Sequence, residues 1–322
     1  MDRLLIIDGN ALIHRAYHAL PSFKTMDGIP TNAVYGFASM LHRTIEDFQP
    51  SHVLVCFDTA AKTFRDELYK EYRAHRPEAD NDLILQFPMV REFLNAAVIP
   101  YIEKDGFEAD DLIASVCKKF STNIHCLVLT GDKDIFQLVD DRVIVTTPLN
   151  GDKNLKIYDH DEVVKKFGVD PNQIPDFKAL AGDPSDNYKG VAGVGPKTAT
   201  ELIQRFESVE ELYKKIEQIE NPSLKQKLID GKESALMSKE LAVLKKDIEI
   251  SVSIEDTQFK GYNDSLGDFF EKYSFRSLAG RMMRGNQNRN STIASGAQMN
   301  KGKNDHKRGR KKQPNLNQLD LF

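Results

Sequence analysis

The stretch RLLIID, residues 3–8, is an unbroken apolar run that ends in an aspartate. Such a run predicts a buried strand, and a helical pattern follows it at NAVYGFASMLHRTIEDF, residues 32–48. The same order of strand and helix recurs at VLVCFD (53–58) and KTFRDELYKEYRAHR (62–76), VIPYI (98–102) and ADDLIASVCKKF (109–120), and IHCLVLTGD (124–132) and KDIFQLV (133–139), before a last strand-like RVIVTT (142–147). This alternation predicts an α/β fold with a mostly parallel sheet flanked by helices.

After about residue 160 the pattern turns helical, apart from a late strand-like IEISVSI at 248–254. We therefore expect an α/β core over 1–175, which includes an arch at about 60–90, and a helical region over 176–280. Residues 281–317 are dominated by Asn, Gln, Ser, Gly and Lys and predict a flexible basic linker. The chain ends in the peptide QLDLF, residues 318–322.

Composition narrows the class of protein. The chain has 322 residues, is 40% hydrophobic and contains no apolar run of the roughly 20 residues that a membrane helix needs. It also shows no signal-peptide layout, so we expect a cytoplasmic protein with no membrane partner. The three cysteines, Cys56, Cys117 and Cys126, sit in apolar stretches, which favours buried thiols over disulfides or zinc ligands.

The net charge of −4 hides an asymmetry. Residues 281–322 contain ten Lys and Arg against two Asp, so this segment carries +8 and the remainder carries −12. A basic tail indicates either a polyanionic partner or a solvated linker. The acidic remainder requires its own explanation.

Three of the predicted strands end in carboxylates: RLLIID at Asp8, VLVCFD at Asp58, and IHCLVLTGD at Asp132, with Asp134 close behind. Because the carboxyl ends of parallel strands meet at one edge of a sheet, these side chains should converge. Acids in GFEADDL, which opens a helix, and in the loop AGDPSDN complete a set of nine: Asp8, Asp58, Glu108, Asp110, Asp111, Asp132, Asp134, Asp183 and Asp186. Each one alone fits a turn or a helix start, but so many together would repel one another unless cations lay between them. Ligands that are all oxygen favour Mg²⁺ or Mn²⁺, and two such ions suit phosphodiester cleavage.

Two segments could hold a phosphate backbone. If residues 62–76 form one helix, a single face carries Lys62, Arg65, Tyr69, Arg73 and Arg76, four cations with one aromatic ring for stacking. In GVAGVGPKTATELIQRF (190–206) a glycine-rich turn precedes a helix, and its exposed N–H groups could receive a phosphate; the residues concerned are Gly190, Gly193, Gly195, Lys197 and Thr198. A solvated helix face and an ordinary helix connection are the alternatives. Neither segment would read base edges, so the sequence predicts recognition of nucleic-acid shape.

From residue 3 to about residue 280 the chain resembles the 5′ nuclease (flap endonuclease) family, and most closely the 5′→3′ exonuclease part of bacterial DNA polymerase I. The segments that carry the resemblance are IDGNALIHRAYHAL, FDTAAKTFRDELYKEYRAHRP, GFEADDLIA, LTGDKDIFQLV and LAGDPSDNYKGVAGVGPKTA. The resemblance implies a PIN-like 5′ nuclease core with a helical arch and a C-terminal helix-hairpin-helix region. Unlike the polymerase, this chain continues into the polar tail.

The resemblance also implies roles for individual residues. One ion would be held by Asp8, Asp58, Glu108 and Asp110, and the other by Asp132, Asp134, Asp183 and Asp186, with Asp111 near both. Lys62 and Arg65 would touch the scissile phosphate, and Tyr69 would stack on the unpaired terminal base. A K⁺ ion would join the glycine hairpin to duplex DNA.

The peptide QLDLF resembles the motif by which bacterial replication and repair proteins dock onto the sliding clamp. It would be buried on that partner through Gln318, Leu319, Leu321 and Phe322, and the linker would let the enzyme search around the clamp.

The function expected from the whole sequence is that of a monomeric, nucleoid-associated bacterial 5′→3′ exonuclease and flap endonuclease. It would remove 5′ flaps and RNA primers in replication and repair. The alternatives are a non-catalytic module that binds branched DNA, a metal-dependent RNase of similar topology, and, less well supported, a phosphatase that forms an aspartyl-phosphate.

Overall fold

The computed structural model describes residues 2–148 and 155–283, and its centre is a six-stranded sheet in the order β3-β2-β1-β4-β5-β6. The strands are β1 (Arg3–Asp8), β2 (His52–Phe57), β3 (Tyr101–Glu103), β4 (His125–Leu129), β5 (Val143–Pro148) and β6 (Leu155–Tyr158). The first five pair in parallel and β6 is antiparallel to β5. The mostly parallel sheet is therefore confirmed. The edge strand β6 is not among the predicted strands.

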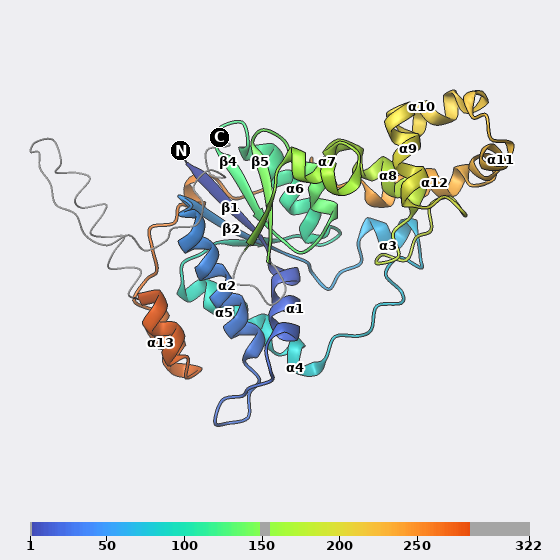
Figure 1. Cartoon of the computed structure of the whole chain (residues 1–322). Coiled ribbons are helices and arrows are strands. Elements are labelled where there is room, and N and C mark those ends of the chain that lie inside the picture. Colours follow the sequence, from blue (N-terminus) through green and yellow to red (C-terminus); the bar gives the residue numbers. More distant parts are fainter. Residues whose placement is uncertain (1, 149–154, 284–322) are drawn as a thin grey trace, which may run out of the picture.

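Helices cover both faces of the sheet (Figure 1). In β1, Leu5 and Ile7 point into a core shared with α1, α2, α5 and α13, while Leu4 and Ile6 point into a core shared with α6. This is the alternation that a strand buried on both faces produces. The bounds are α1 (Gly9–Ala19), α2 (Asn32–Phe48), α5 (Gln86–Ala96), α6 (Ala109–Phe120) and α13 (Leu266–Lys272). The predicted helices over 32–48 and 109–120 coincide with α2 and α6.

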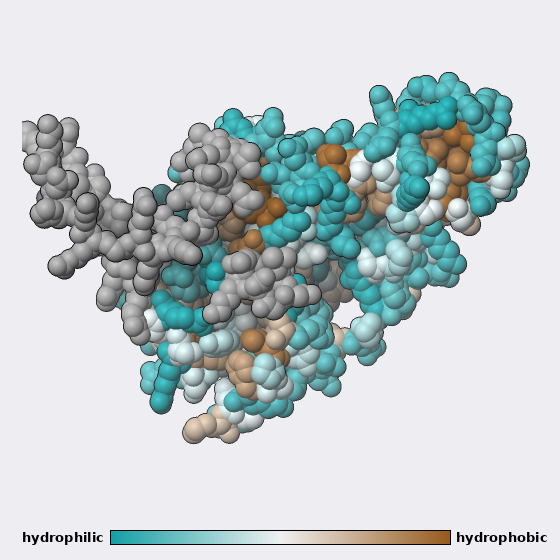
Figure 2. Space-filling view, viewed as in Figure 1, coloured by the Kyte–Doolittle hydropathy of each residue, from teal (hydrophilic) through white to brown (hydrophobic). Residues whose placement is uncertain are grey.

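The helical region projects from one end of the sheet and has a hydrophobic core of its own (Figure 1). Its elements are α7 (His160–Phe167), η2 (Pro171–Gln173), α8 (Ile174–Ala181), α9 (Pro196–Phe206), α10 (Val209–Lys214), η3 (Ile216–Gln218), α11 (Pro222–Asp230) and α12 (Lys232–Ala242). Figure 2 shows a mostly hydrophilic surface around the hydrophobic residues of this projection. No helix among the described residues is both long and apolar enough to cross a membrane.

The predicted helix over 62–76 is wrong. Only α3 (Phe64–Leu68) is helical there, and the arch continues as turns to α4 (Asn81–Ile84). The chain leaves the helix at Tyr69, and Arg73 adopts a left-handed backbone with φ 53°. Side-chain contacts with distant residues hold this path, because the Tyr72 ring is buried against Tyr188 and α12. The five residues of the expected stripe therefore do not share one helix face.

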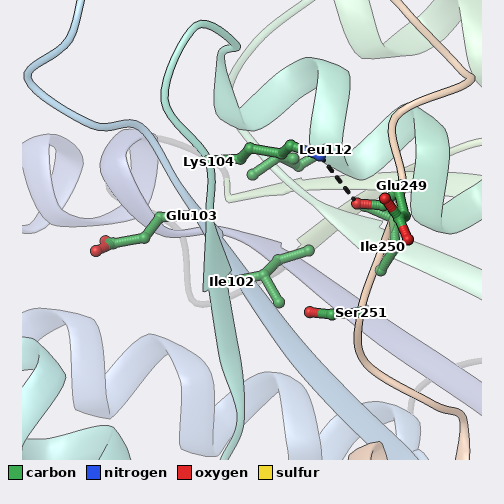
Figure 3. A pocket seen from close by; sticks show the side chains of 7 residues that line it. All are labelled: Ile102, Glu103, Lys104, Leu112, Glu249, Ile250 and Ser251. Atoms are coloured by element: carbon green, nitrogen blue, oxygen red, sulfur yellow. Dashed lines mark hydrogen bonds between the residues drawn. The ribbon is translucent and has the colours of Figure 1, made fainter.

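Two other predicted elements differ in detail. Residues 133–139 contain a 3-10 helix, η1 (Asp134–Leu138), in place of an α-helix. Another 3-10 helix, η4 (Glu255–Thr257), follows the segment 248–254. That segment forms no strand, although Ile248 and Ile250 are buried against the α6 face of the sheet. It passes beside the edge strand β3, and a pocket lined by Ile102, Lys104 and Glu249 among others separates the two (Figure 3). The alternating apolar residues of the segment 248–254 are thus buried although the segment does not pair with a strand.

Candidate metal centre

Two of the predicted acids follow adjacent parallel strands. Asp8 is the last residue of β1 and the N-cap of α1, and Asp58 follows β2 directly. The oxygens of Asp8 accept hydrogen bonds from the amide of Ala11 (2.9 Å) and the hydroxyl of Thr130 (2.7 Å). Asp58 Oδ1 accepts from the amide of Ala109, the first residue of α6, at 2.6 Å. The sheet edge and the start of α6 are therefore joined through a candidate metal ligand.

The N-terminus of α6 contributes three more acids. Glu108 is the N-cap, and its side chain and that of Asp111 form a reciprocal capping box. Asp110 is only 7% exposed, and its carboxylate has no hydrogen-bond or ion-pair partner among residues 2–148 and 155–283. A buried carboxylate that lacks a partner from the protein either takes up a proton or needs a bound cation to stay ionised.

Burial, and then the like charges of neighbouring acids, raises the pKa values of these carboxylates. Burial and then the charge of Asp58 raise the pKa of Asp8 to about 7. Burial and then Asp132 raise the pKa of Asp110 well above its ordinary value. Burial also raises the pKa of Glu108 to about 7, although Arg73 and Arg65 oppose the shift. Proximity of a divalent cation would reverse these shifts, because it favours the ionised carboxylates.

A second set of acids lies across the seam between the sheet and the helical region. Asp132 and Asp134 follow β4, and Asp132 Oδ1 accepts from the amide of Asp134 at 2.9 Å. Asp134, Asp183 and Asp186 each place a carboxylate oxygen within 4.8 Å of the other two, a spacing that could hold a metal ion. The structure therefore brings acids of the core and of the loop after α8 together, as the sequence predicts.

In this second set most of the acids are paired with cations of the protein, whereas in the first set only Glu108 is paired among the described residues, through Arg73 and Arg65. The Lys178 ammonium contacts both Asp134 and Asp183. Asp186 Oδ1 accepts from Arg73 Nε (2.9 Å) and Arg76 (2.6 Å). Although burial opposes the shift, Lys178 lowers the pKa of Asp183 and Arg73 lowers that of Asp186.

Three contributors to the site were missed from the sequence. Thr130 orients Asp8, Lys178 lies between two acids, and the Tyr72 hydroxyl donates to Asp186 at 3.0 Å and to Glu108 at 3.3 Å. Only Thr130 had a usable signal, because it precedes Gly131 and Asp132 at the end of a strand. Lys178 sits in an amphipathic helical pattern, which gave no indication of its role.

Asp111 and Arg65 form a buried ion pair that the sequence did not predict. Asp111 is 0% exposed, and its oxygens accept from Arg65 Nη1 (2.7 Å), Arg65 Nη2 (2.9 Å), and the amides of Glu108 (3.2 Å) and Lys245 (2.9 Å). Arg65 is 1% exposed and donates also to the carbonyl of Leu241 at 2.8 Å. Arg65 and Asp111 are thus paired with each other in the interior. The predicted place of Asp111 near both ions and the predicted contact of Arg65 with the scissile phosphate stay predictions. The pair is a buried anchor that ties α3 to α6 and to the end of α12.

The remaining predicted substrate contacts lie apart from this anchor. Lys62 is exposed and lines an open pocket with Phe64 and Lys245, while Tyr69 is half-buried with its hydroxyl on Glu71. Arg73 and Arg76 do not lie on a shared helix face: Arg73 pairs with Glu108, and Arg76 pairs with Asp186.

The predicted glycine hairpin forms the turn before α9. Gly190 and Gly193 have φ of 61° and 76°, the left-handed conformation that glycine favours. A Cβ at Gly190 would lie 2.4 Å from the amide nitrogen of Gly182. Gly195 is the N-cap of α9, Lys197 is exposed and Thr198 is half-buried. The start of α9 is therefore open to an anionic ligand.

The donor set fits divalent metal ions that prefer oxygen. The nine predicted ligands are all carboxylates, and Asp110 is a buried acceptor without a donor among the residues that the structure describes. Such a set suits Mg²⁺ or Mn²⁺.

Comparison with known proteins identifies the family. Residues 3–168 match the family model of the 5'-3' exonuclease N-terminal resolvase-like domain, and residues 169–265 match that of the 5'-3' exonuclease C-terminal SAM fold. The chain is 40% identical over 261 residues to a 5'-3' exonuclease of Aquifex aeolicus (strain VF5), which covers 81% of this chain and 88% of that protein. It therefore belongs to the 5'-3' exonuclease family.

DNA polymerases are also among its relatives. The chain is 40% identical over 282 residues to DNA polymerase I of Bacillus subtilis (strain 168) and 39% identical over 284 residues to that of Caldicellulosiruptor bescii. Each match covers 87% of this chain but only 32% and 33% of the respective polymerase. The chain thus spans about a third of the length of these relatives.

Solved structures share the fold at low sequence identity. A T5 5'-exonuclease with bound zinc ions has a TM-score of 0.62 at 24% identity and covers 84% of this chain and 98% of that one. The catalytic core of Rad2 in complex with a DNA substrate has a TM-score of 0.59 at 19% identity and covers 88% and 92%.

The raised pKa values predict how stability in EDTA depends on pH. Asp8 and Glu108 have pKa values of about 7 when folded but about 4 when unfolded, so the folded protein binds more protons between these limits. Their stabilisation, complete below pH 4, is therefore lost as the pH rises through 7. The lowered pKa values of Asp183 and Asp186 act below about pH 4, outside this window.

We expect the melting temperature in EDTA to fall between pH 5 and pH 8, and to fall less in excess Mg²⁺. Circular dichroism melts in both conditions measure the difference. Asp8→Asn should reduce the slope in EDTA. A melting temperature that rises over this range without metal would contradict the assignment.

Proposed function

We propose that this protein is a metal-dependent 5′→3′ nuclease that hydrolyses phosphodiester bonds at 5′ ends and 5′ flaps, with two bound Mg²⁺ or Mn²⁺ ions. The observation that carries the proposal is the group Asp8, Asp58 and Asp110, whose carboxylates have no ion-pair partner among residues 2–148 and 155–283, at one sheet edge of a 5'-3' exonuclease family member. When bound, the ions would supply Lewis acidity for in-line hydrolysis to a 5′-phosphate and a 3′-hydroxyl.

The side chains would act through position and charge. Asp8, Asp58 and Asp110, with Glu108, would hold one ion, and Asp132, Asp134, Asp183 and Asp186 would hold the other. Thr130 and the amide of Ala109 fix the orientation of Asp8 and Asp58. Ligands already held by the protein lose little further freedom when an ion binds.

The substrate proposed is branched or 5′-flapped DNA, including RNA-primed DNA. Lys62 is exposed beside the arch, and Tyr69 on the same segment is available to stack on a base. The open start of α9 would hold duplex phosphates, with a K⁺ ion at the hairpin of Gly190 and Gly193. These grips address backbone and shape, which suits an enzyme that recognises a junction.

The test compares one labelled 5′-flap duplex with its single-stranded arm, in Mg²⁺ and in EDTA. We expect cleavage near the junction only in Mg²⁺, with the single strand largely spared. Binding of the flap without cleavage in either Mg²⁺ or Mn²⁺ would instead identify a DNA-binding module. A preference for plain single-stranded RNA would identify a related RNase.

We also propose that the chain docks on the bacterial sliding clamp through Gln318, Leu319, Leu321 and Phe322, and that it works as a monomer in the cytoplasm near the nucleoid. These four residues, and the linker from residue 284, lie outside the described residues. The support is the sequence alone: three large apolar side chains end a polar, basic segment.

Deleting residues 318–322 should leave cleavage of naked flap DNA unchanged and abolish its stimulation by a clamp loaded on the same DNA. The matched control deletes residues 293–297, which shortens the linker by the same length and keeps the peptide. Cleavage rates with and without clamp measure both effects. Equal stimulation of the two deletion variants would exclude docking through QLDLF.

A further inference from the structure

One lysine lies inside the second set of acids. Lys178 belongs to α8, which packs against η1, and its ammonium contacts carboxylate oxygens of Asp134 and Asp183. Its side chain is only 9% exposed. Asp183 is held in turn by Ser185, whose amide donates to it at 2.8 Å. The ammonium is therefore fixed between two predicted metal ligands by a buried helix.

The two sets of acids differ in this respect. In the first set Glu108 is paired with Arg73 and Arg65, but Asp8, Asp58 and Asp110 have no ion-pair partner among residues 2–148 and 155–283. In the second set Asp134 and Asp183 share Lys178. Arg73 and Arg76 reach the same set through Asp186, but from the irregular arch and with side chains 22% and 46% exposed. Lys178 is thus the more deeply buried of the protein's cations at this set.

An ammonium and a divalent ion compete for the same oxygens. A second ion bound between Asp134 and Asp183 requires the atoms that Lys178 Nζ contacts, and the lysine is tethered there at a high effective concentration. The positive charge also repels an approaching cation at short range and low dielectric. Within the described part of the chain, no lysine or arginine forms an ion pair with Asp8, Asp58 or Asp110.

We propose that Lys178 is an internal counter-ion that lowers the affinity for the second metal ion. The ion at Asp8, Asp58 and Asp110 then binds first, and the ion at Asp134 and Asp183 binds second. The inference rests on the proposed two-metal function and deepens it. It assigns to Lys178 a positioning role through the acids, without contact with the reacting atoms.

The experiment titrates Mn²⁺ into the full chain without DNA, followed by calorimetry and by the electron paramagnetic resonance signal of free Mn²⁺. The wild type should bind two ions with clearly separated dissociation constants. Lys178→Met keeps the side-chain length and removes the charge. It should lower the dissociation constant of the second ion at least about tenfold and change that of the first ion by less than about threefold. The control is Lys239→Met, because Lys239 pairs with Asp176 and Glu210 and contacts none of the nine acids.

Thermal stability gives an independent readout. Lys178→Met leaves Asp134 and Asp183 without their ammonium, so Mn²⁺ should raise its melting temperature more than that of the wild type. Lys178→Gln, whose amide can still donate a hydrogen bond, should show the same changes to a smaller degree and serves if the Met variant is unfolded without metal.

If both Lys178 variants bind the second Mn²⁺ ion with unchanged or lower affinity than the wild type, the inference is overturned. The proposed function would still stand, provided that the wild type binds two ions. A wild type that binds no Mn²⁺ would overturn both. The two failures are therefore distinguishable.

Discussion

Replacing Asp110 by asparagine is expected to reduce kcat for flap cleavage by about a thousandfold or more and to leave the fold intact. The carboxylate is buried and has no hydrogen-bond or ion-pair partner within the described part of the chain, so on the proposed function its charge would serve the metal ion and not the structure. A bound metal ion contributes several kcal/mol of transition-state stabilisation. Because each ~1.4 kcal/mol of activation free energy changes the rate about tenfold, losing the ion lowers kcat by roughly this magnitude. Asparagine has nearly the same shape, and it removes the repulsion from Asp132 and Asp8.

Three measurements check this expectation: single-turnover cleavage, binding of the uncleaved flap, and thermal melting in EDTA. Flap binding should be retained, and the melting temperature in EDTA should be equal or higher. Asp105→Asn is the matched control, because Asp105 is exposed in the loop just before the same helix. A variant that cleaves at the rate of the control would remove Asp110 from the metal centre.

The neighbouring residue should behave in the opposite way. Asp111→Ala is expected to lower the free energy of unfolding by about 3–5 kcal/mol, because it leaves the buried Arg65 guanidinium without its carboxylate. For a chain of this size the loss corresponds to a decrease in melting temperature on the order of 10 °C. Two adjacent aspartates would thus separate catalysis from stability.

The double variant Arg65→Met with Asp111→Ala tests the cause. Removing both charges should recover part of the lost stability, since no unpaired charge then remains in the interior. Urea unfolding of both single variants and the double variant gives the coupling energy. An Asp111→Ala protein with normal stability and lost Mn²⁺ binding would instead support the prediction that Asp111 lies beside the ions.

The sequence predicted the positions of the acids better than their partners. Asp8 and Asp58 follow strands, and parallel strands place their ends at one edge, so local pattern and topology suffice. Likewise α2 and α6 have strong helical periodicity, and the acids at the start of α6 complement the helix dipole.

The arch shows where that reasoning stops. Its path depends on Arg65 with Asp111, 46 positions away, and on Arg73 with Asp186, 113 positions away. Periodicity within residues 62–76 contains no information about these pairs, so it predicts a helix where charge pairing and the burial of Tyr72 hold turns. Lys178 was missed for the same reason, because its role is visible only once Asp134 is brought beside α8.

The seam between the two family segments has an evolutionary consequence. The boundary falls between residues 168 and 169, yet Asp183 and Asp186 lie beyond it, and the amide of Arg73 donates to the carbonyl of Asp186 at 3.1 Å. Recombination at this boundary would preserve the sheet and most of its acids but exchange two ligands and the backing of the arch. The segments are therefore expected to be inherited together, as one unit of selection, even though residues 169–235 contain a hydrophobic core of their own.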